Sequence, residues 1–497
     1  MADLNLARAA EDRFERLGDY DEIVFEGRTY RSGELFERSR RLAGGLSALG
    51  VEPGDRVVVF AANRPEIQIV YHAIWRAGAV VTPAIFLLPP PELRHIVEGA
   101  EARLVITSAE FADAAREAAG ATAVVTTDDF PDLEQTGPLP VVARGDADLA
   151  ALMYTGGTTG RAKGVMLTHA NLWHVGRAAD EAGFEPGIAR GLMALPLSHA
   201  FGLLITVIDL HDREPGLTVL MRWFEPAAWL ELAQEHRIQI AAAVPSMLRR
   251  LLDEPLEEYE LSELRYLASG ASPLAPETVR ELRRRLPSVE IREGYGLTET
   301  SGLVSTNRPG RIRMGSVGEP APGVEVRIVD DGDNELPAGE VGEICCRSTF
   351  VMAGYWRDAD ATAAAVRGGW LYTGDLGSLD EDGYLYVVDR KKDLIIRSGL
   401  NVFPRDVEEA LCEHDAIETA AVVGRPDLAH GEEVVAFVSL HDGRSADPAE
   451  LVAWARTRLG GYKYPREMHV LPALPLTPVG KVDRKALRAK LVEAVEA

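Results

Sequence analysis

Cysteine is scarce in this sequence. The 497-residue chain has three, Cys345, Cys346 and Cys412, an odd number with no C-x-x-C pair. Such a set builds neither a disulfide framework nor a paired-thiolate metal site. Sparse cysteines are typical of a reducing compartment, so the cytoplasm is the expected location. The first residues, MADLNLARAAEDRFERLG, also lack the apolar stretch of a secretory signal.

Long hydrophobic runs are missing as well. The nearest candidate, residues 67–88, is interrupted by Gln68, Arg76 and Pro83, so no membrane span is expected. Basic residues are outnumbered, because Lys and Arg total 53 against 77 Asp and Glu, a formal net charge of −24. A field of that sign repels phosphate backbones and argues against nucleic acid or an anionic membrane as the main partner. A small anionic ligand in a local positive pocket remains compatible with it.

Lysine is the rarest of the charged residue types, with seven against 46 arginines. A lysine that persists in this background marks a position where a compact charge on a flexible stem is needed and a guanidinium does not replace it. This argument nominates Lys163, Lys392 and Lys481 before any motif is considered.

The order of apolar patterns predicts an α/β protein. Short β-rich runs, such as residues 55–61, 103–107 and 122–126, alternate with helical stretches such as 33–49 and 226–236, which is typical of parallel sheets with helices on their faces. After about residue 310 Gly and Pro become dense, and the strands predicted at 324–329, 342–347 and 383–388 indicate a smaller barrel-like section.

A separate small α+β domain is expected after the charged sequence DRKK at 389–392. It contains strands predicted at 393–396, 420–423 and 434–440, and helices predicted at 404–412 and 448–459. The predicted division is therefore a domain at 1–389, a link at 390–392 and a C-terminal domain at 393–497.

The most informative segment is YTGGTTGRAKGV at 154–165, which follows an apolar run predicted to be a strand. Glycines allow backbone N–H groups to converge on an anion, threonine hydroxyls add donors, and Lys163 adds positive charge. This combination favours binding of a phosphate or pyrophosphate. It is not a Walker A loop, because Lys163 is followed by Gly164 rather than Ser or Thr.

Four further segments carry chemistry that is weak when each is taken alone. REGYGLTET at 292–300 places Tyr295 between glycines and supplies Glu299 as a hard oxygen ligand for Mg²⁺. YTGDL at 372–376 contains Asp375, which can accept hydrogen bonds from a ribose diol. DRKKDLIIRSGLNVFP lies at 389–404, and PLTPVGKVDRKAL at 475–487 contains Lys481.

Together and in this order, the five segments resemble the core motifs of the adenylate-forming (ANL) superfamily, which contains acyl-CoA synthetases, peptide-synthetase adenylation domains and beetle luciferases. The resemblance covers nearly the whole chain. It implies a large N-terminal adenylation domain, a small mobile C-terminal domain, and the use of ATP, Mg²⁺ and CoA.

The resemblance implies a nucleotide site. Thr298 is expected at the α-phosphate, Glu299 at Mg²⁺, Asp375 at the ribose with Arg390 beside it, and Lys481 between the attacking carboxylate and the α-phosphate. The remaining residues implied for ATP binding are Thr155, Gly156, Gly157, Thr158, Thr159, Gly160 and Lys163 in the phosphate loop, Gly270, Ala271 and Ser272 in the adenine-side loop, Tyr295, which would stack on the other adenine face, and its neighbours Glu293, Gly294 and Gly296.

The resemblance also implies two half-reactions, separated by rotation of the C-terminal domain. Lys392 occupies the hinge position, and the turn at Ser398 and Gly399 would line the channel for the CoA pantetheine. The family often has two glycines there, so Ser398 is a departure.

The acyl pocket implied by the resemblance contains His199, Ala200, Gly202, Gly302 and Leu303. Amino-acid-activating relatives carry an Asp where this chain has Ala200, so an amino acid is disfavoured. The small and apolar residues suggest a fatty or an aryl acid, as in fatty acid metabolism.

Three other interpretations stay open at this stage. The acyl group could pass to a carrier-protein pantetheine, with the basic group Arg484, Lys485, Arg488 and Lys490 as a docking patch. A luciferase-like oxygenase and a non-catalytic nucleotide sensor are further alternatives. A homodimer is compatible with the sequence, which shows no oligomerisation motif.

Overall fold

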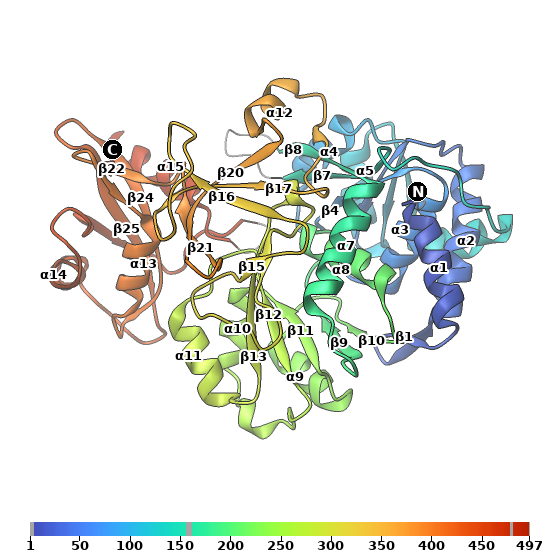
Figure 1. Ribbon diagram of the computed structural model, residues 1–497, viewed down its shortest axis with the longest axis horizontal. Coiled ribbons are helices and arrows are strands. Elements are labelled where there is room, and N and C mark those ends of the chain that lie inside the picture. Colours follow the sequence, from blue (N-terminus) through green and yellow to red (C-terminus); the bar gives the residue numbers. More distant parts are fainter. Residues whose placement is uncertain (1–3, 156–161, 478–480, 497) are drawn as a thin grey trace. The chain divides into compact units, whose positions relative to one another are not determined.

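The computed structural model describes residues 4–155, 162–477 and 481–496, and it divides into two compact units (Figure 1). The first, here the N-terminal unit, contains Met1–Val326, Cys346–Leu371 and Gly383–Leu385. The second, here the C-terminal unit, contains Arg327–Cys345, Tyr372–Asp382 and Tyr386–Ala497. Each is described by itself below.

A seven-stranded sheet organises one half of the N-terminal unit, in the order β18-β8-β7-β4-β3-β5-β6. Strands β3 (Arg56–Phe60), β4 (Val80–Ala84), β5 (Leu104–Thr107), β6 (Ala123–Thr126) and β7 (Leu149–Thr155) are parallel, whereas β8 (Lys163–Thr168) and β18 (Gly354–Tyr355) are added antiparallel. The run Val57–Phe60 is buried throughout, as expected for a parallel strand covered on both faces.

A nine-stranded sheet organises the other half, in the order β15-β14-β13-β12-β11-β9-β10-β1-β2. Its parallel core consists of β1 (Asp21–Phe25), β10 (Leu217–Leu220), β9 (Arg190–Met193), β11 (Ile240–Ala243), β12 (Tyr266–Ser269) and β13 (Glu290–Tyr295). The edges are β2 (Arg28–Arg31), β14 (Ser305–Thr306) and β15 (Glu319–Pro320). The carboxyl ends of β12 and β13 lead into the adenine-side segments predicted from sequence, at the edge where parallel sheets bind ligands.

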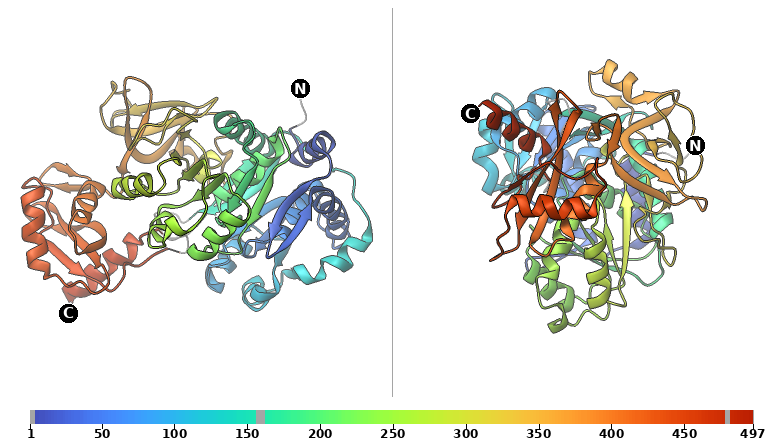
Figure 2. Two further views of the ribbon diagram at one scale, coloured as in Figure 1. Left: turned by 90° about the horizontal axis from the view of Figure 1, so that it is seen from below. Right: turned by 90° about the vertical axis from the view of Figure 1, so that its left-hand side faces the viewer.

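Helices flank both sheets of the N-terminal unit (Figure 2). Their bounds are α1 (Leu6–Leu17), α2 (Ser32–Ala48), α3 (Pro65–Arg76), α4 (Pro90–Gly99), α5 (Ala112–Ala119), α6 (Phe130–Leu133), α7 (His169–Gly183), α8 (Ala200–Ile208), α9 (Pro226–Glu235), α10 (Pro245–Leu252), α11 (Pro276–Arg285) and α12 (Ala359–Ala365). Several begin with proline, which is preset for the first helical turn and has no N–H to leave unpaired. The helices predicted at 33–49 and 226–236 are confirmed as α2 and α9.

The C-terminal unit ends in a five-stranded sheet built on the long hairpin β24 (Ile417–Asp427) and β25 (Gly431–Leu440), with β22 (Ile395–Arg397), β23 (Leu400–Val402) and β26 (Glu467–Val470). Alternate residues of the hairpin face two separate cores. Val434 and Val438 pack with residues of α13 (Pro404–Cys412) and α14 (Pro448–Arg458), whereas Val435 and Phe437 pack with residues of α15 (Arg484–Glu496). This period of two explains why the run Val434–Val438 is apolar without interruption.

A second five-stranded sheet contains β16 (Glu325–Val329), β17 (Gly342–Arg347), β20 (Trp370–Leu379), β19 (Val366–Arg367) and β21 (Leu385–Arg390). The strands predicted at 324–329, 342–347 and 383–388 are therefore present. The predicted fold class, parallel α/β sheets followed by a smaller domain with antiparallel pairing, is confirmed. No helix in the part of the chain that the structure describes is long and apolar enough to cross a membrane.

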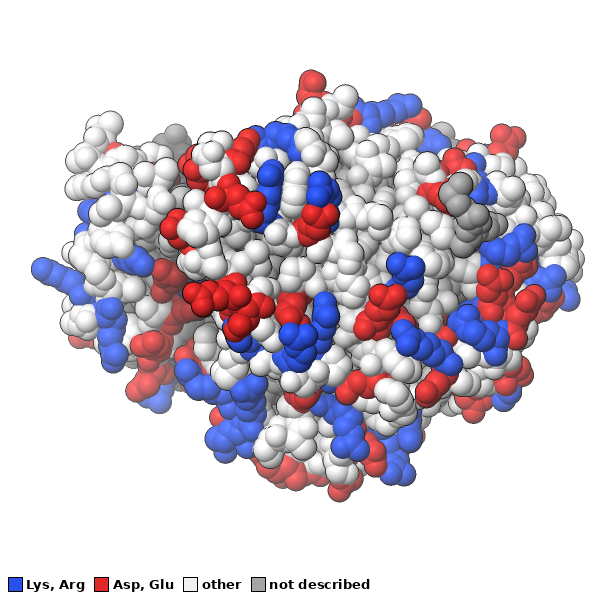
Figure 3. All heavy atoms as spheres, viewed as in Figure 1, with Lys and Arg blue, Asp and Glu red and all other residues white. Residues whose placement is uncertain are grey.

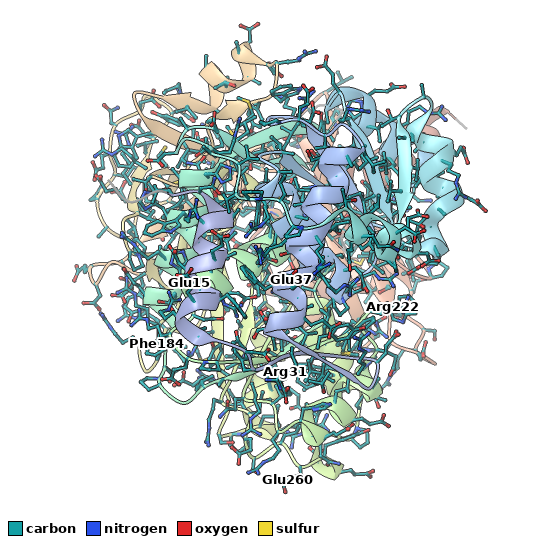
Figure 4. The ribbon with its side chains drawn as sticks, turned by 90° about the vertical axis from the view of Figure 1, so that its right-hand side faces the viewer. Glu15, Arg31, Glu37, Phe184, Arg222 and Glu260 are labelled. Atoms are coloured by element: carbon teal, nitrogen blue, oxygen red, sulfur yellow. The ribbon has the colours of Figure 1, made fainter. Side chains whose placement is uncertain are left out.

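Charged side chains of both signs are interspersed on the face shown in Figure 3. Arginine supplies most of the ion pairs. On the face shown in Figure 4, Arg31 Nε lies 2.8 Å from Asp19 Oδ2, and Arg222 Nε lies 2.8 Å from Glu26 Oε1. These pairs use arginine, the abundant basic residue of this chain.

Candidate active site

The phosphate-loop motif lies in a hairpin between β7 and β8, where Thr155 pairs with Lys163 across the ladder. The predicted residues Gly156, Gly157, Thr158, Thr159 and Gly160 lie outside the described residues. The sequence analysis missed His95 of α4, whose Nε2 is 3.0 Å from the Ala162 carbonyl oxygen. The His95 ring also packs edge-on against Tyr154 at 6.1 Å between centroids. One side chain therefore contacts the motif at two of its residues, Tyr154 and Ala162.

Lys163 belongs to a group of four polar side chains, here the Lys163 cluster: Lys163, Glu299, Tyr355 and Asp358. The Lys163 Nζ lies 3.7 Å from Asp358 Oδ2 and 5.2 Å from the centroid of the Tyr355 ring. The Tyr355 hydroxyl donates a hydrogen bond of 2.8 Å to Glu299 Oε1. The structure thus brings together Lys163 and Glu299, which the sequence placed 136 positions apart, and it adds Tyr355 and Asp358, which the sequence analysis did not identify.

The turn carrying Thr298 and Glu299 depends on close backbone approach. Residues Thr298–Thr300 form a single 3-10 turn after β13, and the Leu297 N–H donates to Thr300 Oγ1 at 2.9 Å. A Cβ on Gly296 would lie 2.2 Å from the Gly302 carbonyl oxygen. The glycine assigned to the nucleotide is therefore also required for the turn to fold back on itself.

The segment predicted beside adenine follows β12. Gly270 lies opposite the end of β13, because a Cβ on it would come 3.3 Å from the Gly294 carbonyl oxygen. Ala271 has a positive φ of 70°, a conformation that costs a non-glycine residue on the order of 1 kcal/mol. Glu293 is fixed through its carbonyl, which accepts from the Asn307 N–H at 2.9 Å. The parallel pair β12–β13 thus brings Gly270, Ala271, Ser272 and Glu293–Gly296 to one edge of the sheet.

The predicted acyl-pocket residues come from the start of α8 and from the turn at 302–303. His199 caps α8, with its Nδ1 accepting from the Phe201 N–H at 3.3 Å. Gly302 has φ of 97°, and a Cβ there would lie 3.3 Å from the Ala200 carbonyl oxygen, so the two segments are neighbours. Ala200 and Leu303 are buried.

Gly202 has an additional structural reason to be glycine. A Cβ at this position would lie 2.3 Å from the Pro196 carbonyl oxygen and 2.5 Å from Leu197 Cα. Its contact with an acyl group stays a prediction. The sequence analysis also missed Phe201, whose Cε1 would lie 3.7 Å from a Cβ on Gly270. Phe201 therefore reaches from α8 to the adenine-side segment.

The C-terminal unit contains a second charged group, here the Lys481 cluster: Asp375, Arg390 and Lys481. Asp375 is buried, and its Oδ1 lies 3.3 Å from Arg390 Nε. Burial lowers the pKa of Lys481 to about 8, and the nearby Arg390 charge acts in the same direction, whereas Asp375 opposes them. The Lys481 backbone is held by Thr477, whose N–H donates to the Lys481 carbonyl at 2.7 Å.

The predicted hinge is surrounded by ion pairs and backbone hydrogen bonds. Desolvation lowers the pKa of Lys392, and Arg390 adds to the effect. The neighbouring Lys391 was predicted only as part of the link at 390–392, and its Nζ lies 2.9 Å from Asp331 Oδ1 and 3.0 Å from Glu343 Oε2. Asp389 accepts from the Arg405 N–H at 2.9 Å, at the start of α13.

Ser398 and Gly399 form the tight turn between β22 and β23. Both have positive φ, 52° and 77° respectively, which explains why glycine suits each position. The Ser398 N–H donates to the His430 carbonyl at 2.7 Å, which fixes the turn against the hairpin β24–β25. A Cβ on Gly399 would meet no atom within 4 Å.

Half of the basic group considered for carrier-protein docking is paired with carboxylates within the C-terminal unit. Arg484 donates to both oxygens of Glu408, at 2.6 and 2.8 Å. Arg488 Nη2 lies 2.7 Å from Asp393 Oδ1. Two of the four cations therefore have internal structural roles.

Comparison with known proteins identifies the chain. The family model described as AMP-binding enzyme matches residues 10–356, and that of the AMP-binding enzyme C-terminal domain matches residues 406–481. A feruloyl-CoA synthase of Amycolatopsis sp is 38% identical over 464 residues, covering 92% of this chain and 93% of the relative. A long-chain-fatty-acid–CoA ligase of Bacillus subtilis (strain 168) is 34% identical over 521 residues, covering 96% of this chain and 92% of the relative.

Among solved structures, o-succinylbenzoate coenzyme A synthetase (MenE) from Bacillus subtilis, in complex with ATP and a magnesium ion, has a TM-score of 0.87 and 29% identity, covering 97% of this chain and 99% of that one. The resemblance drawn from the five motifs is confirmed. The chain belongs to the AMP-binding enzyme family, in the acyl-CoA synthetase branch of the adenylate-forming superfamily.

Proposed function

We propose that this protein activates a carboxylic acid with ATP, releases pyrophosphate, and transfers the acyl group from the acyl-adenylate to the thiol of CoA. It is an AMP-forming acid–CoA ligase, and its relatives are named feruloyl-CoA synthase and long-chain-fatty-acid–CoA ligase. The observation that carries the proposal is the Lys481 cluster, in which a lysine with a pKa of about 8 lies near a buried Asp375 and Arg390. Two cations near one carboxylate suit a site that receives a further anion.

The first half-reaction forms one bond and breaks one. A carboxylate oxygen attacks the α-phosphorus of ATP, and the bond to the departing pyrophosphate breaks. We assign Lys481 to the carboxylate and α-phosphate oxygens, where a positive charge stabilises the developing negative charge. Thr298 is assigned to the same phosphate. Because the pKa of Lys481 is about 8, the side chain is mostly protonated at neutral pH.

We assign the binding of the two outer phosphates to residues of the N-terminal unit. The β- and γ-phosphates are proposed to bind to Lys163, Thr155, Gly156, Gly157, Thr158, Thr159 and Gly160. The Glu299 carboxylate, held by Tyr355 at 2.8 Å, fits a hard divalent cation. Mg²⁺ bound there supplies charge neutralisation of the triphosphate. Asp375 is proposed to accept from the ribose hydroxyls, with Ala271 and Tyr295 on the two faces of adenine.

The second half-reaction requires the thiol to approach the acyl carbon. We propose that residues 390–392 form a hinge between domains 1–389 and 393–497, with Lys392 as the pivot. The turn at Ser398–Gly399 is proposed to line the channel for pantetheine, because a Cβ on Gly399 would meet no atom within 4 Å and the space beside the turn is therefore open. The thiol forms the new bond to the acyl carbon, and AMP leaves with the oxygen.

The acid is proposed to carry an apolar tail. The proposed pocket residues include one imidazole, and the others are small or apolar: His199, Ala200, Gly302 and Leu303. None of these four has a carboxylate that could hold an ammonium group. The relatives are named for ferulate and for long-chain fatty acids, which share this character.

A carboxylate panel tests the proposal. Pyrophosphate release is measured with ATP, Mg²⁺ and C4 to C18 fatty acids, benzoates and cinnamates, with and without CoA. We expect an accepted acid to give release that CoA accelerates, with an acyl-CoA product. Release that CoA leaves unchanged would contradict CoA as the acceptor and favour a carrier protein or another nucleophile.

A further inference from the structure

Residues 352–358 of the N-terminal unit connect two elements that are proposed to contact the triphosphate. On one side, the Met352 N–H donates to the Glu299 carbonyl at 2.8 Å. On the other side, Tyr355 pairs with Val165 of β8, and the Trp356 N–H donates to the Gly164 carbonyl at 2.7 Å. The segment therefore fixes the distance between the turn at Glu299 and the start of β8.

Tyr355 contacts both elements through its side chain. Its hydroxyl donates to Glu299 Oε1 at 2.8 Å, and its ring lies 5.2 Å from the Lys163 ammonium. Asp358, three residues further along the same segment, lies 3.7 Å from the same ammonium. The Lys163 cluster is thus assembled on one short stretch of chain.

The hydroxyl is chemically suited to hold a carboxylate. A phenol hydroxyl is protonated at physiological pH, so it can donate to the Glu299 oxygen 2.8 Å away. A carboxylate that accepts a hydrogen bond at one oxygen is restricted in orientation, and partners of this kind commonly tune metal affinity.

We propose that Tyr355 is a positioning residue for the magnesium–ATP complex: its hydroxyl orients Glu299 toward the cation, and its ring holds Lys163 beside it. This inference rests on the proposed roles of Glu299 and Lys163. The backbone of Tyr355 is also held by the fold, because its N–H donates to Thr362 Oγ1 at 2.8 Å.

Tyr355→Phe separates the two contacts, because it removes the hydroxyl and keeps the ring and its packing. Binding of a non-hydrolysable ATP analogue is measured by calorimetry in EDTA and again in excess Mg²⁺, and the gain in affinity due to Mg²⁺ is compared. We expect binding in EDTA to match the wild type within twofold. The Mg²⁺ gain should fall about tenfold, the lower end of the range for lost partners of metal ligands.

Tyr386→Phe is the matched control, because Tyr386 also hydrogen-bonds a carboxylate, Asp380 Oδ2 at 3.2 Å. It should keep the full Mg²⁺ gain. A double variant gives a second readout. If Tyr355 acts through Glu299, adding Tyr355→Phe to Glu299→Gln should change the Mg²⁺ gain no further.

The outcomes separate the inference from its foundation. A wild type that gains affinity from Mg²⁺ and a Tyr355→Phe variant that gains equally would overturn the inference alone. Additive losses in the double variant would do the same. A wild type that gains nothing from Mg²⁺, or a Glu299→Gln variant that gains normally, would overturn the assignment of Glu299 and the inference with it.

Discussion

The Lys163 cluster and the Lys481 cluster handle charge in opposite ways. In the N-terminal unit, Lys163 lies near the Asp358 carboxylate and a tyrosine ring, and Glu299 accepts a hydrogen bond. In the C-terminal unit, Lys481 and Arg390 lie near one buried carboxylate, and the pKa of Lys481 falls to about 8. The first cluster is organised by its own partners, and the second holds an excess of positive charge.

This difference agrees with the division of roles proposed for the two units. A group that positions a substrate works best when its own side chains are already fixed. A group that stabilises charge developing in a transition state works best when its charge is not already compensated. Loss of the excess positive charge should therefore have the largest effect on activity, and changes to its surroundings should have smaller ones.

Lys481→Ala should have the largest effect. It removes the charge assigned to the α-phosphate and the attacking carboxylate, so adenylate formation should fall by about a hundredfold or more, the scale for losing one such electrostatic contact. Transfer to CoA from a preformed acyl-adenylate should remain near the wild-type rate. Both rates are measured by rapid quench. Lys485→Ala, which changes an exposed lysine on α15, is the control and should leave both rates unchanged. An equal loss of both half-reactions in Lys481→Ala would contradict the assignment.

Asp375→Asn should have the next largest effect. The asparagine keeps the size of the side chain but loses the negative charge beside Arg390 and one acceptor for the ribose diol. We expect the KM for ATP to rise about tenfold, which corresponds to about 1.4 kcal/mol of lost binding. The KM for the acid should be unchanged. Asp333→Asn, at an exposed turn of the same unit, should leave both KM values as they are.

The pH dependence tests the excess charge without a substitution. Because the free-enzyme pKa of Lys481 is about 8, lowered mainly by burial, kcat/KM for adenylate formation should decline as the pH rises through about 8. The sign follows from the requirement for the protonated amine. Bound triphosphate favours that protonated form, so the decline in kcat should begin at higher pH than the decline in kcat/KM. A flat kcat/KM profile between pH 7 and 9 would contradict the account.

Substitutions in the turn at 398–399 should have the smallest effects. Gly399→Ala places a Cβ on a residue with φ of 77°, so it should lower the free energy of unfolding by about 1 kcal/mol. Ser398→Gly relieves the same type of strain at φ of 52°, while the greater freedom of glycine in the unfolded chain offsets the gain. The free energy of unfolding of Ser398→Gly, measured in urea, should therefore change by less than that of Gly399→Ala. The KM for CoA reports separately whether the turn meets pantetheine.

The sequence predicted those features that depend on local pattern. The helix at 404–412 and the strand at 342–347 were predicted with the observed bounds, because apolar periodicity and flanking proline are local signals. Among the lysines, scarcity alone pointed to Lys163, Lys392 and Lys481. In the structure Lys163 and Glu299 both contact Tyr355, and Lys392 and Lys481 have lowered pKa values.

Features that depend on tertiary contact were not predicted. Tyr355 lies 56 residues from Glu299 along the chain, and nothing near it in the sequence indicates that the two side chains meet. His95 was missed for the same reason, and the ion pairs of Lys391 were not foreseen although the residue lies in the predicted link at 390–392. Gly202 and Gly296 were predicted as site residues, and only the packed structure shows that each is also required by close backbone approach.

The most direct test of the central claim follows an oxygen atom. An accepted acid labelled with ¹⁸O in its carboxylate is incubated with ATP, Mg²⁺ and CoA, and the phosphate products are examined by mass spectrometry. Attack on the α-phosphorus followed by thiol transfer predicts AMP carrying one ¹⁸O and unlabelled pyrophosphate. Unlabelled AMP, or ADP together with labelled inorganic phosphate, would contradict adenylate formation as the route to the thioester.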